Sequence, residues 1–313
     1  MKILVTGATG FIGKALSQAL RNSDFDLRVA VRQRDIKLPI DYEVVQVGDI
    51  GPQTEWQEAL IGVDAVIHLA ARVHIMNDPA ANPVEVFRKV NVFGTERLAR
   101  MAVKAGVKRF IFISSDKVNG EGSGVPYTEK DKPEPQDAYG ISKMEAEQKL
   151  AFVAAETGLK IVILRPPLVY GAGVKANFKS LIKFSSFGIP LPFKGISNRR
   201  SFIYLGNLVD AISICITHPL AVGETFLVSD GQDVSIPDLI KMIACAMNKA
   251  VVLFYLHPNI LKILCRIVGK SEELKKLTGS LVVDSSKIRN LLGWRPPFTL
   301  EEGIRETVLK NKC

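Results

Sequence analysis

Cysteine and histidine are scarce in this 313-residue sequence, and neither is arranged to bind a metal. The four cysteines include no CxxC pair and no spacing typical of a zinc site, and the four histidines form no spaced cluster. We therefore predict no metal site, exclude a disulfide-rich miniprotein and interpret the thiols as small buried groups in a reducing compartment. These residues are Cys215, Cys245, Cys265 and Cys313, and His68, His74, His218 and His257.

The sequence also lacks a hydrophobic run long enough to cross a bilayer. Its most apolar stretch, residues 251–268, is interrupted by a proline and contains Lys262 and Arg266. The first residues, KILVTGATG, predict a strand and a glycine loop rather than a signal peptide, so we expect a cytoplasmic protein. Residues 259–270 have the pattern of a basic amphipathic helix, for which we favour packing over a substrate pocket above contact with a membrane surface.

Acidic residues are outnumbered, because 32 Asp and Glu stand against 41 Lys and Arg and the formal net charge is +9. Such an excess favours an anionic partner. Runs of five like charges are absent and no aromatic residues alternate with the basic ones, so we predict no nucleic-acid partner. Phosphate on a small ligand is the favoured partner, and an evenly basic surface is the alternative.

Short apolar runs alternate with helical patterns over the first 165 residues. The runs are continuous and rich in Val and Ile, which is typical of strands buried on both faces of a parallel sheet. The alternation predicts an α/β fold with a Rossmann-type, doubly wound parallel sheet. The runs are Ile3–Val5, Leu27–Val31, Val44–Val47, Ala65–Leu69, Phe110–Ile113 and Ile161–Leu164, and the main helical patterns are Phe11–Leu20, Val84–Ala105 and Tyr139–Thr157.

The alternation loosens after residue 165, where prolines and glycines cluster. We predict that residues 1–165 form the Rossmann domain and that residues 201–217 return to it as one more strand and helix. Residues 166–200 and 218–313 are then expected to form a smaller, mixed substrate-binding region.

A glycine-rich loop joins the first predicted strand to the first predicted helix. Gly7 permits the tight turn, Gly10 lets the backbone approach a pyrophosphate, and Gly13 allows the helix to pack closely on the strand. The pyrophosphate would lie on the N-terminus of the helix. The GxxGxxG spacing departs from GxGxxG, but its position predicts a dinucleotide site formed by Gly7, Thr9, Gly10, Phe11, Ile12 and Gly13.

Arg32 follows the second predicted strand, where an acidic residue would bind the ribose 2′-hydroxyl of NAD. An arginine there accepts a 2′-phosphate and favours NADP, and a solvated surface arginine is the alternative. Asp49 and Ile50, after the third predicted strand, are candidates for contact with the adenine. An ordinary turn is the alternative for Asp49.

Tyr139 and Lys143 are four residues apart and lie on one face of a predicted helix. A neighbouring cation favours the phenolate, so we expect Lys143 to lower the pKa of Tyr139 and to make it an acid and base for a hydroxyl/ketone pair. Ser114 and Ser115 follow a predicted strand and are expected nearby.

With these motifs, the chain resembles an extended short-chain dehydrogenase/reductase of the nucleotide-sugar epimerase/dehydratase family over nearly its whole length. It is most similar to bacterial C4 reductases and epimerases of UDP-sugars in O-antigen synthesis, such as those that form UDP-N-acetylquinovosamine. Besides GATGFIG and YGISK, the matching pieces are HLAA (68–71), NVFGT (91–95), SSDKVNGE (114–121), RPPLVYG (165–171), RRSFIYLGN (199–207) and LGWRPPFTLEEGI (292–304).

The resemblance implies roles for individual residues. Ser115 matches the serine that hydrogen-bonds the sugar C4 oxygen, Tyr139 the proton donor and acceptor, and Lys143 the lysine that binds the nicotinamide ribose. Asn91 is expected to be structural and His68 to be a strand residue. Further cofactor contacts are expected from Leu69, Ala70, Ala71 and Pro166, and substrate contacts from His74, Lys117, Asn177 and Arg200, the last two at the nucleotide diphosphate.

We favour a UDP-sugar 4-keto reductase that uses NADP or NAD, with NADP preferred. The alternatives are a UDP-hexose 4-epimerase, a 4,6-dehydratase and a catalytically silent dinucleotide sensor. The dehydratase is disfavoured because Lys117 follows Asp116 where those enzymes have Glu, and the sensor because Ser115, Tyr139 and Lys143 are all present. A homodimer is possible.

Overall fold

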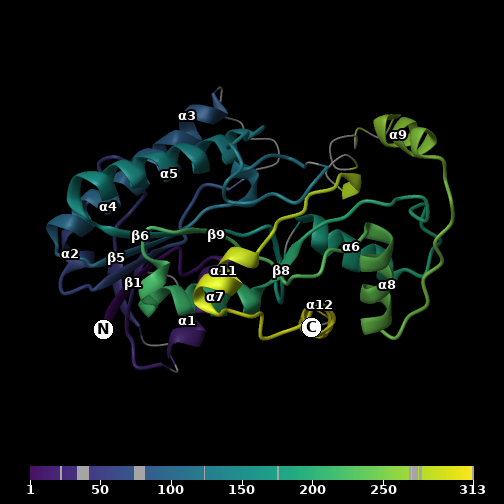
Figure 1. The fold of residues 1–313 in the computed structure, drawn as a ribbon. Helices are drawn as coiled ribbons and strands as arrows, with labels where there is room; N and C mark the ends of the chain where they lie inside the picture. Colours follow the sequence, from purple (N-terminus) through teal and green to yellow (C-terminus); the bar gives the residue numbers. More distant parts are fainter. Residues whose placement is uncertain are drawn as a thin grey trace.

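A seven-stranded parallel sheet forms the larger part of this computed structural model (Figure 1). The structure describes residues 1–311 except 22, 34–41, 74–81, 123, 175, 268, 270–273, 275 and 276. The strand order β3-β2-β1-β4-β5-β6-β9, in which the chain reverses direction across the sheet beside β1, confirms the Rossmann prediction. The strands are β1 Lys2–Thr6, β2 Asp26–Val31, β3 Glu43–Gln46, β4 Ala65–His68, β5 Arg109–Ile113, β6 Lys160–Arg165 and β9 Thr225–Leu227.

Helices cover both faces of this sheet, which is why its strands are almost wholly apolar. One core is formed by alternate strand residues such as Ile3 and Val5 with α1 and α7, and the other by residues such as Leu4 and Val66 with α2, α4 and α5. Alternate side chains point to opposite faces, so a strand buried on both sides must be apolar throughout. The helices are α1 Phe11–Arg21, α2 Gln57–Leu60, α4 Gly94–Lys104, α5 Ala138–Thr157 and α7 Leu205–Thr217.

The long helix predicted over residues 84–105 is three consecutive segments in the structure. They are α3 Pro83–Phe87, the π-helical segment η1 Arg88–Phe93 and α4. Asn91 in η1 donates to Ser142 Oγ on α5 at 2.9 Å and exchanges hydrogen bonds with the backbone of Arg72, so it is structural, as expected. A π-helical turn re-aims one side chain within a helix, and apolar periodicity does not reveal it.

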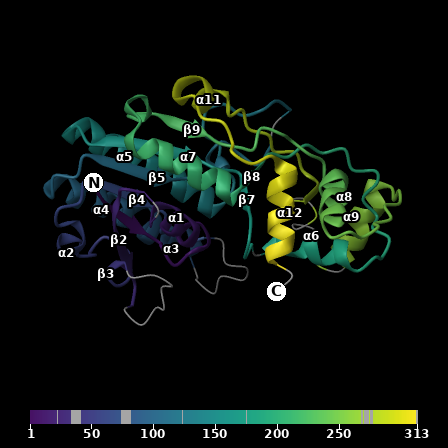
Figure 2. The ribbon, with the colours of Figure 1, turned by 90° about the horizontal axis from the view of Figure 1, so that it is seen from below.

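A smaller lobe with its own core is formed by the C-terminal half of the chain (Figure 2). It is built around Tyr170, which stacks on Phe178 at 5.2 Å between ring centroids and donates to Asp230 Oδ2 at 2.7 Å. Burial and Asp230 raise the pKa of Tyr170. Its elements are the two-stranded parallel sheet β7 Leu168–Tyr170 and β8 Phe202–Tyr204, with α6 Ala176–Ser186, α8 Ile236–Ala246, α9 Pro258–Ile267 and α12 Leu300–Lys310.

Segments of the domain and of the lobe alternate along the C-terminal half of the chain. α7 packs on the main sheet, but β8, the strand of residues 201–217, pairs with β7 in the two-stranded sheet. β9 and α11 (Ser286–Leu292) also belong to the main sheet and its core, although both lie within the segment 218–313 that was assigned to the smaller region. The short helices η2 Asp116–Val118 and η3 Pro219–Ala221 complete the described elements.

Two other expectations differ from the structure. Cys215 is buried, with its pKa raised to about 12 by burial, but Cys245 is exposed because it lies on the outer face of α8. The amphipathic segment forms α9, and its isoleucines are exposed rather than packed over a pocket. None of the described helices is both long and apolar enough to cross a membrane, and the described residues contain no cluster of metal-ligating side chains.

Candidate active site

The β1–α1 loop has the close packing that the glycine pattern predicts. Gly7 has φ +73°, and a Cβ atom there would lie 2.7 Å from the backbone nitrogen of Ala70. A Cβ at Gly13 would lie 2.1 Å from the Gly7 carbonyl oxygen, so α1 can approach the loop only with glycine at that position. Gly10 itself is exposed, and its amide donates to Gly7 O at 2.9 Å. The loop and the N-terminus of α1 are therefore open to an anion at Gly10.

The segment after β4 lies beside this loop because β4 pairs with β1. Thr6 Oγ1 lies 2.7 Å from His68 Nδ1 and accepts from the Ala70 amide at 3.2 Å. His68 is a fully buried strand residue, as predicted, and burial lowers its pKa to about 3. A neutral His68 between Thr6 and Thr95 orients the segment that contains Leu69, Ala70 and Ala71, all partly exposed beside the glycine loop.

Arg32 and Asp49 contact each other at the carboxyl ends of β2 and β3. Arg32 Nε lies 3.0 Å from Asp49 Oδ1, and both side chains are largely exposed, at 74% and 84%. The guanidinium thus has a carboxylate partner, which the sequence prediction of a phosphate contact did not include. Ile50 is also partly exposed, and its side chain packs against Gly94 at the start of α4.

Ser115 and Asp116 lie at the carboxyl end of β5, next to the end of β6. The Asp116 amide donates to the carbonyl of Pro166 at 3.1 Å, which joins the two strand ends. Ser115 Oγ donates to Asp116 Oδ1 at 3.1 Å. Burial raises the pKa of Asp116 to about 6, and the positive charge of Arg200 opposes that shift.

Tyr139 and Lys143 lie on the face of α5 that is turned to these strand ends. Lys143 is buried, its Nζ donates to Ile113 O at 2.7 Å, and it lies 5.9 Å from the centroid of the Tyr139 ring. The start of α5 is fixed by an N-cap, because Asp137 Oδ1 accepts a hydrogen bond from the Gly140 amide at 2.7 Å. The cap places Tyr139 in the first turn and Lys143 one turn later.

The expected effect of Lys143 on Tyr139 is wrong for this structure. Burial raises the pKa of Tyr139 well above its usual value, and the negative charges of Asp116 and Asp137 add to the shift. Burial also lowers the pKa of Lys143 to about 7, so its cation is only partly populated at neutral pH. The sequence pattern shows the tyrosine–lysine pair but neither the burial of Tyr139 nor its two acidic neighbours, which together raise its pKa.

Lys117, predicted to contact substrate, instead joins two parts of the site. Its Nζ lies 2.5 Å from Asp137 Oδ2 and 2.8 Å from Glu121 Oε1. Asp137 is the residue that caps α5, so Lys117 ties the β5 loop to the start of the helix that carries Tyr139. Burial opposes the charge of Lys117, yet the two carboxylates raise its pKa overall.

Arg200 reaches the same site from the C-terminal lobe. Its backbone exchanges hydrogen bonds with Val234, and its Nη1 donates to Gly279 O at 3.1 Å. Burial lowers the pKa of Arg200, against the attraction of Asp116 and Glu121. The guanidinium therefore interacts electrostatically with the Asp116 carboxylate beside Ser115.

Two predicted substrate residues fall outside this description. His74 lies among the residues that the structure does not describe. Asn177 lies in the first turn of α6, and its side chain is outside the described part of the chain.

Sequence patterns missed a buried polar network behind the site. Glu147 Oε1 accepts from Ser114 Oγ at 2.5 Å and from Arg165 Nε at 3.0 Å, and Arg165 Nη1 donates to Asn119 Oδ1 at 3.1 Å. Glu147 lies one turn after Lys143, and its charge opposes the fall in the Lys143 pKa. The i+4 spacing of Glu147 after Lys143 was the available signal.

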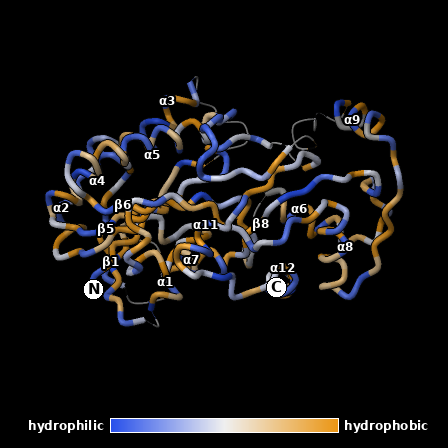
Figure 3. The backbone as a smooth tube through the Cα atoms, in the orientation of Figure 1, coloured by the Kyte–Doolittle hydropathy of each residue, from blue (hydrophilic) through white to orange (hydrophobic). Residues whose placement is uncertain are grey.

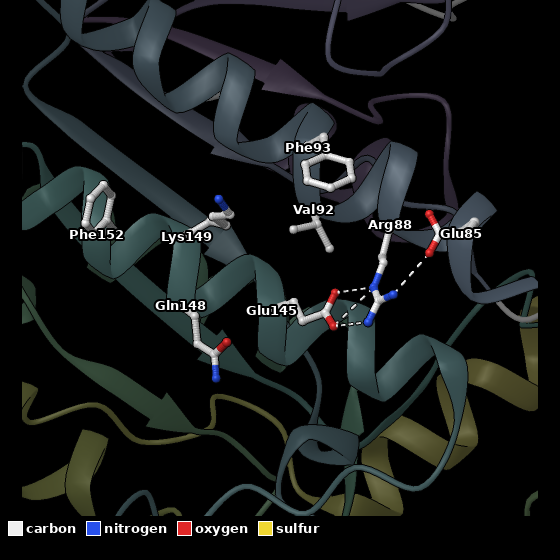
Figure 4. Close-up of a pocket in the computed structure, with 8 residues that line it drawn as sticks. All are labelled: Glu85, Arg88, Val92, Phe93, Glu145, Gln148, Lys149 and Phe152. Atoms are coloured by element: carbon white, nitrogen blue, oxygen red, sulfur yellow. Dashed lines mark hydrogen bonds and ion pairs between the residues drawn. The ribbon is translucent and has the colours of Figure 1, made fainter.

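The opposite face of α5 borders a separate hollow of about 500 Å³ (Figure 4). There Arg88 pairs with Glu145 at 2.6 Å and with Glu85 at 3.1 Å, and Phe93 and Phe152 are exposed. Tyr139 and Lys143 lie on the other side of the helix, so this hollow is not part of the candidate active site.

The residues present fit a dinucleotide in three ways. Gly10 is exposed at the end of the turn. A Cβ atom at this position would lie 3.1 Å from the Gly7 carbonyl oxygen, which is a tight contact. The β4 segment borders that turn, and the buried Lys143 has donors beyond the one used by Ile113 O. A buried amino group with hydrogen-bonding capacity beyond one carbonyl partner is suited to bind ribose hydroxyls.

Comparison with known proteins agrees with this arrangement. The model of the NAD dependent epimerase/dehydratase family matches residues 3–229. A UDP-glucose 4-epimerase of Vibrio cholerae is 45% identical over 309 residues, covering 97% of this chain and 94% of the relative. The NAD complex of UDP-glucuronic acid 4-epimerase from Bacillus cereus superposes with a TM-score of 0.79 at 25% identity, covering 100% of this chain and 99% of the other.

A short-chain dehydrogenase/reductase superfamily protein from Agrobacterium tumefaciens, with bound NAD, has the same TM-score of 0.79 at 24% identity, covering 100% of this chain and 97% of the other. The fold, the pair of Tyr139 and Lys143 and the close relative agree. The chain therefore belongs to the NAD-dependent epimerase/dehydratase family of enzymes.

Proposed function

We propose that this enzyme interconverts the C4 epimers of a UDP-hexose with NAD as a resident cofactor. The observation that carries the proposal is that Tyr139 and Lys143 on α5 lie at the carboxyl end of β5 with Ser115 and Asp116, and that Arg200 acts on Asp116 from the lobe. The similarity to a UDP-glucose 4-epimerase supports epimerisation over the reductase that we favoured from sequence. The role in O-antigen synthesis and the cytoplasmic location stay predictions.

Proton transfer at the C4 oxygen is assigned to Tyr139. Ser115 Oγ is placed to hydrogen-bond that oxygen and align it, while Tyr139 takes the hydroxyl proton and later returns it. NAD, when bound, supplies the hydride acceptor and a positive ring that favours the phenolate. Arg200 holds the diphosphate through charge-assisted hydrogen bonds, so the sugar can present either face without losing its anchor.

Asp116 gives the site a second titrating group. It accepts from Ser115 Oγ, and its charge raises the pKa of Tyr139. A protonated Asp116 therefore makes Tyr139 a stronger acid, and an ionised Asp116 makes it a stronger base. The dehydratase stays disfavoured because Lys117 is held by Asp137 and Glu121.

NAD is proposed over NADP because Arg32 already contacts Asp49. A 2′-phosphate would be repelled by that carboxylate while it is attracted to the guanidinium. An epimerase also regenerates its cofactor in each cycle, whereas a reductase consumes it.

Incubation of the purified protein with UDP-glucose, without added cofactor, tests the proposal. We expect a C4 epimer of the substrate in chromatography and mass spectrometry, with no net change in absorbance at the nicotinamide band. Stoichiometric consumption of NADPH with a UDP-4-keto-6-deoxyhexosamine, and no epimer, would instead establish the reductase. Light scattering on the same sample tests the predicted homodimer.

A further inference from the structure

α9 exposes an apolar stripe on the outside of the C-terminal lobe. Ile260, Ile263 and Ile267 lie at i, i+3 and i+7, on one side of the helix, with exposed fractions of 48%, 59% and 78%. Leu261, at 7%, faces inward and anchors the helix to the lobe. Solvent exposure of three isoleucines on one short helix indicates that something apolar covers them in use.

Exposed aromatic residues also lie in the same part of the lobe. Phe254 (42% exposed) and Tyr255 (62%) precede α9, and Phe187 (54%) follows α6, just before the segment that pairs with residues 252–254. That pairing is direct, because the Phe254 amide donates to Leu191 O at 3.0 Å. Figures 1 and 3 show α9 and the preceding segment at the end of the molecule away from the seven-stranded sheet.

The same end of the lobe is strongly basic. We define the basic end as residues 176–195 and 239–267, which contain no Asp or Glu. Lys241 pairs with Asp238 just outside this set, at 3.1 Å. All seven of its lysines and arginine are exposed, and they are Lys179, Lys183, Lys194, Lys241, Lys249, Lys262 and Arg266.

The charge decides which occupant fits this surface. A second copy placed against the basic end would bring like charges together with no carboxylates to pair with, which is costly in a desolvated interface. Protein interfaces are also depleted in lysine, which is the most abundant charged residue here. An anionic lipid surface fits both the positive charge and the exposed isoleucines. Its phosphates pair with the lysines, and the isoleucines enter the boundary of the acyl chains.

We propose that the basic end binds the surface of an anionic lipid bilayer through α9. Ile260, Ile263 and Ile267 insert below the headgroups, and Lys262 and Arg266, on the same helix, contact lipid phosphates. Tyr255 lies at the depth where an aromatic ring with a polar tip is favoured. The short stripe makes this contact reversible and dependent on ionic strength.

Sedimentation with vesicles of phosphatidylglycerol and phosphatidylcholine tests the proposal on the full-length protein. We expect binding at low salt, weaker binding at high salt and none to vesicles of phosphatidylcholine alone. The double substitution Ile263→Asp, Ile267→Asp should reduce binding at least fivefold, and Lys262→Glu, Arg266→Glu should do the same. Both sites are exposed, so the catalytic activity with UDP-glucose should not change.

Matched substitutions on the Rossmann domain serve as controls. Ile61 is 66% exposed and Lys132 is exposed, so Ile61→Asp and Lys132→Glu make the same kinds of change at single sites, to be compared with the single substitutions Ile263→Asp and Lys262→Glu, without touching the basic end. Equal loss in these controls, or no loss in the α9 variants, would overturn the proposal. Failure of the wild type to bind anionic vesicles would also overturn it, as would dimers that α9 substitutions dissociate.

Discussion

The Rossmann domain and the C-terminal lobe place their functional residues by different means. In the domain, Ser115 and Lys143 are buried, and their positions follow from strand pairing and from the capped start of α5. In the lobe, Arg200 is held by backbone bridges to Val234 and Leu281, segments far apart in the sequence. The proposed catalytic residues thus lie on regular elements, and the proposed substrate residue Arg200 lies on an irregular segment.

The lobe also differs from the domain in the exposure of its apolar side chains. The domain has two apolar cores, one on either side of the sheet, whereas the lobe has one core and a helix, α9, with three exposed isoleucines. The exposed face of α9 is therefore available for contact with another surface. Substitutions in the two parts should therefore have separable effects.

The largest effect is expected in the domain, from Tyr139→Phe. Loss of the phenol removes positioned proton transfer, so turnover should fall by about 10²-fold or more. The fold and cofactor content should remain, because the ring still packs against Phe87. Turnover assays with UDP-glucose check this, and Tyr255→Phe in the lobe is the control that should keep full activity.

Arg200→Ala should give the next largest effect. It should weaken the binding of the UDP-sugar and leave the affinity for NAD unchanged. Loss of a hydrogen bond to a charged group costs roughly 1.5–3 kcal/mol, so binding of the UDP-sugar should weaken about 10- to 150-fold. Calorimetry with UDP measures this change. Arg199→Ala is the matched control, since Arg199 is exposed and pairs with Asp233. Weaker binding of NAD in place of UDP would contradict the assignment.

Asp116→Asn should change how stability depends on pH. The pKa of Asp116 is raised to about 6 from 3.8, so the folded state holds its proton more tightly than the unfolded chain. The stability that this group contributes is present below pH 4 and is lost as the pH rises through 6, by up to about 3 kcal/mol. Urea unfolding should show the variant gaining relative to wild type over that range.

The exposed Asp49 provides the control for that measurement. Asp49→Asn makes the same substitution at a side chain that is 84% exposed, so it shows what an Asp→Asn change does without burial. A parallel pH dependence for wild type and Asp116→Asn would mean that Asp116 is not buried as the structure indicates.

The smallest effect is expected for Arg32→Ala. Arg32 and Asp49 are both largely exposed, and exposed ion pairs contribute little. The affinity for NAD should change less than about threefold. A titration of nicotinamide fluorescence measures this, and a strong preference for NADPH that disappears in the variant would instead restore the sequence-based prediction.

The sequence by itself determined the Rossmann sheet, the glycine loop and the pair of Tyr139 and Lys143. These features are local: a strand buried on both faces must be apolar throughout, and residues four apart on a helix share a face. It did not reveal the π-helical segment at Asn91, because that turn depends on contacts with Arg72 and Ser142.

Only the tertiary structure decided which charges surround the reacting groups. Lys117 pairs with Asp137 across 20 residues, and Arg165 with Glu147 across 18, so neither partner is visible in a local pattern. Burial, Asp116 and Asp137 together raise the pKa of Tyr139, although the spacing of Lys143 on the same helix had predicted the opposite shift. Desolvation and long-range charge act through space, and sequence spacing records only what lies one helical turn or one strand away.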